Sequence, residues 1–474
     1  MHMEKKRVWK YGSYAVLMTL ITLGIFVFIA LLVRNVEWKV DMTQSHIYSL
    51  SQQTKDVLGK LKEEIKVSVF YIKNREDQRV DRLLNTYKKY SSHLKIEYID
   101  VLKNPERIKQ YSDIYLDAQY DANPVSVVFE SPKRVKVINH PDMISSSNGQ
   151  AEFEGEQKFT NAIRYISVEK LPVIYYMQGH REPSIDKFAL QSELLKKENY
   201  NVTPLNLLTE KKIPADADII LDVSPQTVFM PEEITEIKRY VDNGGKAVFF
   251  IDPPIANIKQ DISTLKEMIK EWGIEVQDYI AVEGTQNRTY QNAVWILPQI
   301  QNHKITEPII SAGLNILVPY SRTLKTNNKN GFAAESLLKT SSNSWGKLEI
   351  KANNLNKEKT DIIGPLDLAV TASKQISDKT GKKIGETRIF VAGSSSAINE
   401  GVLQNPGNYD FFLNIFGWVK GEAGEITIRP KPSLYSTLNM NNTQRVVTIL
   451  TVLIFIPLAI LIAGLLVWTR RKHL

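Results

Sequence analysis

Two uncharged stretches near the ends of the chain constrain its fold more than any other feature. Residues 14–33 are twenty residues without a charge, and residues 446–468 are 23. At a helical rise of about 1.5 Å per residue, twenty residues reach about 30 Å, the thickness of the hydrocarbon core of a bilayer. A helix packed on a soluble core normally carries a polar face, and residues 14–33 have none. We therefore expect two transmembrane helices with most of the chain between them.

Basic residues flank both stretches on the side of the nearer terminus. They are Lys5, Lys6, Arg7, Lys10, Arg470, Arg471 and Lys472. Because basic flanks are retained on the cytoplasmic side of a membrane, we expect residues 1–13 and 469–474 to be cytoplasmic tails. The chain would then cross the cell membrane twice and hold its large middle part outside the cytoplasm.

The alternative for the first stretch is a cleaved signal peptide. The apolar run is longer than the hydrophobic region of such a peptide, and residues 31–34 (LLVR) do not resemble a small-residue cleavage site. A transmembrane helix is therefore the favoured interpretation.

The net charge of +8 is concentrated at the two ends of the chain. Residues 1–13 and 469–474 carry net +3 each, which leaves +2 for all the rest. The basic bias is thus an orientation signal, and we expect no nucleic-acid partner. The chain has no cysteine, which excludes disulfides, thiolate metal sites and cysteine nucleophiles.

Residues 34–150 have the pattern of a thioredoxin-like outer domain. Apolar and branched residues predict strands at 65–72 and 94–101, with an amphipathic helix between them. A hairpin follows, its first strand preceded by Pro124. Because there is no Cys-x-x-Cys pair, we expect the shape of this fold without redox chemistry.

The sequence pattern of residues 151–432 predicts an α/β outer domain. A helix that begins near Gly155 is expected to join the two outer domains, and after it strands alternate with helices. The predicted strands are 171–177, 218–223, 246–251 and 388–391, and the predicted helices are about 185–198, 231–243, 265–272 and 411–419. This alternation predicts a doubly wound parallel sheet covered by helices on both faces. The pattern weakens from about 282 to 385, which we interpret as an insertion formed partly of loops.

Motifs for known chemistry are few. The sequence has no P-loop, so this chain does not itself hydrolyse nucleotide, and no two of its seven histidines have metal-ligand spacing. We expect no cofactor, no metal and no catalytic residue.

The candidate ligand-binding residues are His180, Glu182 and Asp252. His180 lies in the loop after the first strand of the α/β domain, and Asp252 ends another strand at what should be the same edge. Loops at the carboxyl ends of parallel strands are where open α/β sheets bind ligands. The alternative is that these side chains cap helices and tie loops by hydrogen bonds.

Two polar segments are weaker candidates. Residues 393–396 (GSSS) follow a strand, where a nucleophile would sit, but they do not match G-x-S-x-G and serine-rich loops are usually helix caps. Residues 340–345 (TSSNSW) suit contact with an envelope glycan or protein or, alternatively, a buried anchor for a long loop.

Several segments in this order resemble the GldG family, auxiliary components of ABC transport systems named from bacterial gliding motility. They are residues 41–51 (DMTQSHIYSLS), 155–163 (GEQKFTNAI), 179–182 (GHRE), 240–253 (YVDNGGKAVFFIDP), 337–345 (LLKTSSNSW), 388–395 (RIFVAGSS) and 414–430 (NIFGWVKGEAGEITIRP). The family tends to Gly where this chain has Arg181, and an acidic residue is expected where it has Ser395.

The resemblance implies a membrane-anchored outer domain that works beside an ABC permease and a separate ATPase. It also implies an α/β domain similar to class I glutamine amidotransferases. Those enzymes need a cysteine nucleophile, which this chain lacks, so amidotransferase activity is rejected. The resemblance supplies no catalytic residue.

Three functional hypotheses remain. The first is a non-enzymatic auxiliary subunit of an ABC transport system whose outer domain binds a substrate or an envelope partner. The second is a surface ligand sensor or hydrolase that uses His180, Glu182 and Asp252. The third is an envelope scaffold with no link to transport. Co-purification with a permease or an ATPase would separate the first from the others.

Overall fold

The computed structural model describes residues 49–117, 119, 121–147, 150–254, 260–350, 355–377, 380–421 and 431–432, and scattered positions at 21, 24, 447, 449–455, 458, 462, 464 and 467. Apart from those scattered positions, the predicted spans 14–33 and 446–468 lie outside the described residues. Thr451–Phe455 form a short π-helical segment. Among the residues described, no helix combines the length and the apolar character needed to cross a membrane.

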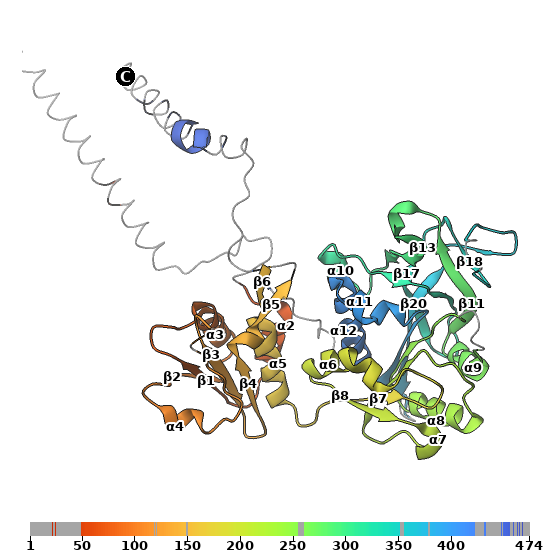
Figure 1. Ribbon diagram of the computed structural model, residues 1–474, viewed down its shortest axis with the longest axis horizontal. Coiled ribbons are helices and arrows are strands. Elements are labelled where there is room, and N and C mark those ends of the chain that lie inside the picture. The colour runs from red at the N-terminus through yellow and green to blue at the C-terminus, as the bar shows by residue number, and fades with distance from the viewer. Residues whose placement is uncertain are drawn as a thin grey trace, which may run out of the picture. The chain divides into compact units, whose positions relative to one another are not determined.

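The N-terminal lobe, residues 51–167, contains a four-stranded sheet in the order β2-β1-β3-β4 (Figure 1). β1 and β2 are parallel, whereas β3 is antiparallel to both β1 and β4. The elements are α2 (Gln52–Gly59), β1 (Ile65–Tyr71), α3 (Gln78–Tyr90), β2 (Leu94–Asp100), α4 (Pro105–Ile108), β3 (Val125–Glu130), β4 (Val135–Asn139) and α5 (Gly155–Ser167). The order of a strand, a helix, a second strand and a hairpin is the one expected from the sequence, and the lobe is a mixed α/β structure.

Helix α5 packs within this lobe. The rings of Phe129 in β3 and Phe159 in α5 lie 5.3 Å apart. The hydroxyls of Tyr87 and Thr160 lie 2.6 Å apart, and Ser131 donates a hydrogen bond of 2.8 Å to the carbonyl of Ile166. We therefore place the end of the N-terminal lobe after α5, later than the boundary at residue 150 that the turn-rich sequence suggested. That turn belongs to a hairpin of β5 (Ile144–Ser147) and β6 (Gln150–Phe153), and β22 (Lys431–Pro432) pairs with β6.

The C-terminal lobe, residues 171–421, is built on one large mixed sheet. Its first half contains β7 (Val173–Met177), α6 (Ala189–Lys197), β8 (Asn201–Leu205), α7 (Leu207–Glu210), β9 (Ala217–Val223), α8 (Pro231–Asp242), β10 (Ala247–Phe250) and α9 (Ser263–Glu271). The strands β8, β7, β9, β10 and β21 (Lys383–Ala392) are adjacent and parallel. The expected parallel α/β sheet is therefore present, as one part of a larger sheet.

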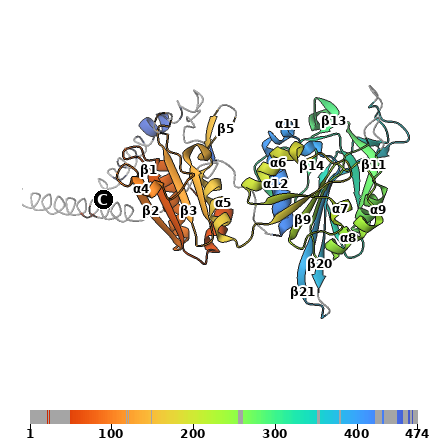
Figure 2. The ribbon, with the colours of Figure 1, turned by 60° about the horizontal axis from the view of Figure 1, so that its bottom comes forward.

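Side chains of the parallel strands alternate between two apolar layers. Val248 and Phe250 of β10 face the layer that contains α6 and α12 (Pro406–Lys420), whereas Ala247 and Phe249 face the layer that contains α8 and α9. A strand buried on both faces has a continuous apolar run in its sequence, as residues 247–251 do. Figure 2 shows the helices of these two layers on opposite sides of the strands.

Residues 282–385 are more regular than their sequence suggested. This segment contains the end of β11 (Ile274–Glu283) and the start of β21. Between them lie β13 (Asn292–Ile296), β16 (Arg322–Thr326), β17 (Ala333–Lys339), β18 (Ser344–Lys347) and β20 (Asp367–Ser377). Strands β18, β11, β16 and β20 continue the parallel sheet as antiparallel neighbours. The periodicity was weak where a strand is short, as in β16 and β18, or partly exposed, as in β17, and β11 pairs with strands that are distant in sequence.

Candidate functional site

The loop that follows β7 carries the predicted residues His180 and Glu182. Its backbone turns sharply, with φ of 128° at Gly179 and 63° at Arg181. The turn brings the Glu182 carboxylate back onto His180. The backbone N–H of His180 donates to Oε2 of Glu182 at 2.7 Å, and Nδ1 of the ring lies 3.1 Å from Oε1. The predicted pair is therefore formed, as a closed local contact.

A second carboxylate and an aromatic ring enclose the other side of His180. Nε2 lies 3.0 Å from Oε2 of Glu233 in α8, and the imidazole stacks on Phe229 with ring centroids 3.6 Å apart. The His180 side chain is 2% exposed. Because both ring nitrogens contact carboxylates, the imidazole presents no free nitrogen to a substrate in this conformation.

The charges around His180 favour its protonated form. Burial by itself lowers the pKa of His180, but the hydrogen bonds and charges of Glu182 and Glu233 outweigh burial and raise the pKa above its ordinary value. An imidazolium between two carboxylates is therefore the favoured state of this group.

Asp222 in β9 adds a third carboxyl group. It is 1% exposed, and neither of its carboxylate oxygens has a hydrogen-bond partner among the described residues. Burial, followed by the charges of Glu182 and Glu233, raises the pKa of Asp222 well above its ordinary value. The neutral, protonated form of Asp222 is favoured because a third negative charge here would be both desolvated and repelled. We call His180, Glu182, Asp222 and Glu233 the C-lobe cluster.

Sequence reasoning missed Asp222 and Glu233, although each had a local signal. Asp222 is a charged residue that follows an apolar run, Ile219 to Leu221, in β9. Glu233 is the third helical residue of α8, and it accepts a hydrogen bond of 2.9 Å from the backbone N–H of Met230. That contact caps the N-terminal end of α8. The same carboxylate oxygen also contacts His180.

The structure places Asp252 with different partners. Its Oδ2 accepts a hydrogen bond of 2.7 Å from the hydroxyl of Ser395, and its carbonyl accepts one of 3.0 Å from the buried Arg322. Within the described residues, no hydrogen bond or ion pair joins Asp252 to His180 or Glu182. The structure thus brings together two of the three predicted residues, and the third ties β10 to the loop after β21.

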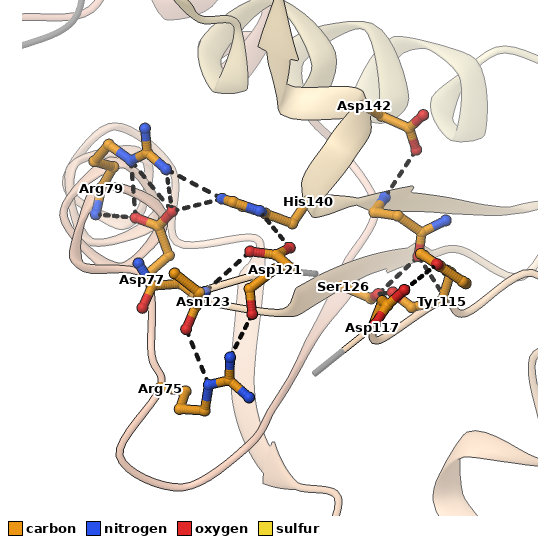
Figure 3. Close-up of polar contacts among 12 residues, drawn as sticks. Arg75, Asp77, Arg79, Tyr115, Asp117, Asp121, Asn123, Ser126, His140 and Asp142 are labelled. Carbon is orange, nitrogen blue, oxygen red and sulfur yellow. Dashed lines mark hydrogen bonds and ion pairs between the residues drawn. The ribbon is translucent and has the colours of Figure 1, made fainter. Parts of the chain in front are cut away.

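The N-terminal lobe contains a second histidine between two carboxylates, which Figure 3 shows. Nδ1 of His140 lies 2.6 Å from Oδ2 of Asp121, and Nε2 lies 3.0 Å from Oδ2 of Asp77. Arg79 also reaches Oδ2 of Asp77, at 2.6 Å. Arg75 donates to the carbonyls of Asp121 and Ala122. We call Arg75, Asp77, Arg79, Asp121 and His140 the N-lobe cluster.

Arginine changes the electrostatics of the N-lobe cluster. Burial by itself raises the pKa of Asp77, but hydrogen bonds with His140 and Arg79 outweigh it and hold the pKa well below its usual range. The hydrogen bond to Asp77 is the largest cause that raises the pKa of His140. Asp77 also accepts from the backbone N–H of Arg79 as the N-cap of α3. These contacts are those of a structural ion-pair network.

The two weaker candidates are partly buried in the C-terminal lobe, whereas Ser342 and Asn343 of the second are exposed. Ser394 is 1% exposed and donates to the carbonyl of Pro319, and Ser395 is bound to Asp252. Thr340 and Ser344 are buried with their hydroxyls 2.6 Å apart, and Trp345 donates to the carbonyl of Leu355. In the part of the chain that the structure describes, no three His, Asp or Glu side chains are arranged to hold a metal ion.

Comparison with solved structures yields distant likenesses. The "mmIFT52 N-terminal domain" is 17% identical with a TM-score of 0.39, over 52% of this chain and 97% of that one. A ThuA-like protein from Parabacteroides merdae is 9% identical with a TM-score of 0.31, over 55% and 93%. The cold-adapted β-galactosidase from Rahnella sp. R3 is 11% identical with a TM-score of 0.27, over 56% and 34%.

Comparison with protein families is more informative. No curated protein matches the chain. A family model described as a domain of unknown function (DUF7088) matches residues 44–143. A second model, described as an ABC-type uncharacterized transport system, matches residues 171–415 and confirms the resemblance to ABC transport-system components. Because this match spans more than half of the 474 residues, the protein belongs to this family of auxiliary components of ABC-type transport systems.

Proposed function

We propose that the protein is a non-enzymatic, membrane-anchored auxiliary subunit of an ABC transport system. The observation that carries this proposal is the family match over residues 171–415, which covers the parallel sheet and most of its extension. An ABC transporter needs an ATPase, and this chain has no P-loop. The proposal therefore includes a separate ATPase and a multi-span permease as partners.

The membrane anchor in this proposal rests on the sequence. Residues 14–33 and 446–468 are uncharged and long enough to span a bilayer, and their basic flanks favour cytoplasmic termini. With that orientation, both lobes would lie outside the cytoplasm and the two helices would pack against the permease.

A role as a binding subunit fits the chemistry of the two clusters. His180 and His140 each have both ring nitrogens in contact with carboxylates, which supports a structural role over general base catalysis. The Asp252 carboxylate accepts a hydrogen bond from the Ser395 hydroxyl, which also weighs against a hydrolase built on Asp252 with His180 and Glu182.

The test is a pull-down of the tagged full-length protein in mild detergent, followed by mass spectrometry. We expect an ABC ATPase and a multi-span permease to be recovered in amounts comparable to the bait. Recovery of the bait alone, at detergent concentrations that leave other membrane complexes intact, would contradict the proposal.

A further inference from the structure

Strand β2 is a free edge of the sheet in the N-terminal lobe. In the order β2-β1-β3-β4 it pairs with β1 on one side, and among the described residues no strand pairs with its other side (Figure 1). β2 runs for 7 residues without a proline, and its pairing with β1 has no register shift. Proteins usually shorten, bend or cover such an edge, because its unpaired backbone groups bind a further strand. β2 has neither a bend nor a break that would prevent this.

The outward backbone groups of β2 belong to Leu94, Ile96 and Tyr98. The ladder with β1 begins with a hydrogen bond from the N–H of Ile65 to the carbonyl of His93, so the odd-numbered residues of β2 face β1. Among the described residues, no hydrogen bond outside this ladder reaches the backbone of the three outward residues. Their N–H and C=O groups are in position to pair with a strand of another molecule.

The sequence of β2 is complementary to itself in one antiparallel register. When Ile96 lies opposite Ile96 of a second copy, Leu94 lies opposite Tyr98 and Lys95 lies opposite Glu97, once on each side of a two-fold axis. The first pair joins apolar side chains on one face of the sheet, and the second joins opposite charges on the other face. The outward residues are the ones that meet, so each pair of them exchanges two backbone hydrogen bonds.

The neighbouring registers and the other edge of the sheet lack this complementarity. A register centred on Lys95 places that lysine opposite itself, and one centred on Glu97 places two acids together. The other edge strand, β4, contains Lys136 and no acidic residue, so it offers no such charge pair. The charges therefore select both the strand and the register.

The other charged side chains on this face are already paired within one copy. Glu97 lies 3.1 Å from Lys66 and 2.5 Å from Arg107, and Lys95 lies 3.7 Å from Glu64. Together these five side chains carry one more positive than negative charge. All are partly exposed, so solvent screens the excess, and the charges set the register more than the affinity. Backbone hydrogen bonds and apolar pairs supply most of the free energy of association.

Exposed apolar side chains gather at the same edge. Tyr98 is 44% exposed in β2, Tyr90 is 47% exposed just before the strand, and Leu102 is 71% exposed just after it. Asp81 of α3 is the charged group that interacts with the Tyr98 hydroxyl on this side. Continued past the ends of the strand, the register centred on residue 96 brings Tyr90 of each copy toward Leu102 of the other. Pairing would thus remove apolar surface from water.

We infer that the protein self-associates through β2, which pairs antiparallel with β2 of a second copy in the register centred on Ile96. The two N-terminal sheets then form one continuous sheet across a two-fold axis, with the same patch used by both copies. The inference is independent of the proposed transport role, because it uses only the N-terminal lobe.

The first experiment is disulfide crosslinking of the full-length protein in cells treated with diamide. The chain has no cysteine, so one introduced cysteine reports on one position. Opposite residues of a hydrogen-bonded antiparallel pair have Cα atoms about 5.5 Å apart, which a disulfide spans. We expect Ile96→Cys to form a dimer, and at least fivefold less dimer from Val135→Cys, although Val135 is 42% exposed at the other edge. Lys95→Cys co-expressed with Glu97→Cys tests the same register without altering Ile96.

The second experiment reverses the charges in the Ile96→Cys background. Lys95→Glu alone and Glu97→Lys alone each place like charges opposite one another, and we expect each to lower the dimer yield at least threefold. When the two variants are co-expressed with different tags, the mixed dimer has opposite charges at both positions. Its yield should return to that of Ile96→Cys alone. Lys136→Glu on β4 is the matched control and should leave the yield unchanged.

Each outcome decides for or against the pairing. Equal crosslinking at positions 96 and 135, or no crosslinking at position 96 and between positions 95 and 97, would overturn the inference. A mixed dimer no more abundant than the two like-charged dimers would show that β2 does not pair in this register. A disulfide from position 96 to a different protein would show that the edge binds another partner, which would also overturn self-association.

Discussion

The N-lobe and C-lobe clusters each place a histidine between two carboxylates, but they compensate the negative charge of these carboxylates differently. In both, each ring nitrogen lies within about 3 Å of a carboxylate. In the N-lobe cluster Arg79 adds a second cation beside Asp77, and the pKa of Asp77 is lowered. In the C-lobe cluster a third carboxyl group takes the place of an arginine, and the pKa of Asp222 is raised.

The comparison shows that a histidine between two acids does not define one kind of site. With arginine present, the carboxylates are compensated and the network behaves as an ordinary buried ion pair. Without arginine, the imidazolium of His180 is the one cation for the three acids of the C-lobe cluster. The excess negative charge is avoided because Asp222 retains a proton. The C-lobe cluster is therefore the more sensitive of the two, and it supports the loop that carries Arg181.

The largest expected effect is the loss of His180. His180→Ala leaves three buried carboxyl groups without a cation, and we expect the C-terminal lobe to lose about 3–5 kcal/mol of unfolding free energy. His140→Ala should lower the stability of the N-terminal lobe by only about 1–2 kcal/mol, because Asp77 keeps Arg79. Hydrogen exchange of peptides from each lobe measures both. Equal losses would show that arginine compensation is not the relevant difference.

Neutralising one acid in each cluster should change stability in opposite directions. Asp222→Asn removes a desolvated carboxyl group that has no hydrogen-bond partner, and we expect a gain of about 1–3 kcal/mol at pH 8. Asp77→Asn weakens contacts with His140 and Arg79, and we expect a loss of about 1–3 kcal/mol. Urea unfolding of the full-length variants distinguishes these signs, and a loss for both would contradict the proposed charge imbalance.

The two lobes should also differ in their dependence on pH. The raised pKa of His180 means that its stabilisation is present below about pH 6.5 and is lost as pH rises through the folded-state value. The raised pKa of Asp222 acts in the same direction, since the folded lobe retains a proton that the unfolded chain releases. We therefore expect the C-lobe cluster to contribute less stability at pH 9 than at pH 5.

The N-terminal lobe should respond at both ends of the pH range. His140 contributes stability below about pH 6.5 that is lost at higher pH, whereas Asp77 contributes stability above about pH 3.8 that is lost on acidification. Hydrogen exchange from pH 4 to 9, corrected for intrinsic rates, tests the response at high pH, and urea unfolding below pH 3.8 tests the acidic response of the N-terminal lobe. His180→Gln combined with Asp222→Asn should remove the contribution of the C-lobe cluster to the pH dependence and leave the N-lobe profile unchanged.

The smallest expected effect is at Arg181. Arg181→Gly relieves the left-handed backbone, and after the larger entropy of glycine in the unfolded chain is subtracted, we expect a gain of about 0.5–1 kcal/mol. Arg181→Ala keeps the strain and should leave stability within about 0.5 kcal/mol of the wild type. Thermal unfolding of both variants measures this, and a lower Tm for Arg181→Gly would mean that the arginine side chain stabilises the loop.

Local signals in the sequence were sufficient for the elements whose contacts are local or strongly periodic. Val80, Leu84 and Tyr87 recur at helical spacing, and they are the buried residues of α3. Residues 247–251 form an apolar run, and they contain β10 between two apolar layers. The pairing of His180 with Glu182 could also be predicted, because only one residue separates them and the turn is local.

Only the tertiary structure decided which residues complete the clusters and where the sheet ends. Glu233 reaches His180 across 53 positions, and Ser395 reaches Asp252 across 143. The antiparallel strands between β11 and β20 pair with neighbours that periodicity does not reveal. The physical reason is that hydrophobic spacing reports which face of an element is buried, whereas the partner of a buried charge depends on how the chain returns to that face.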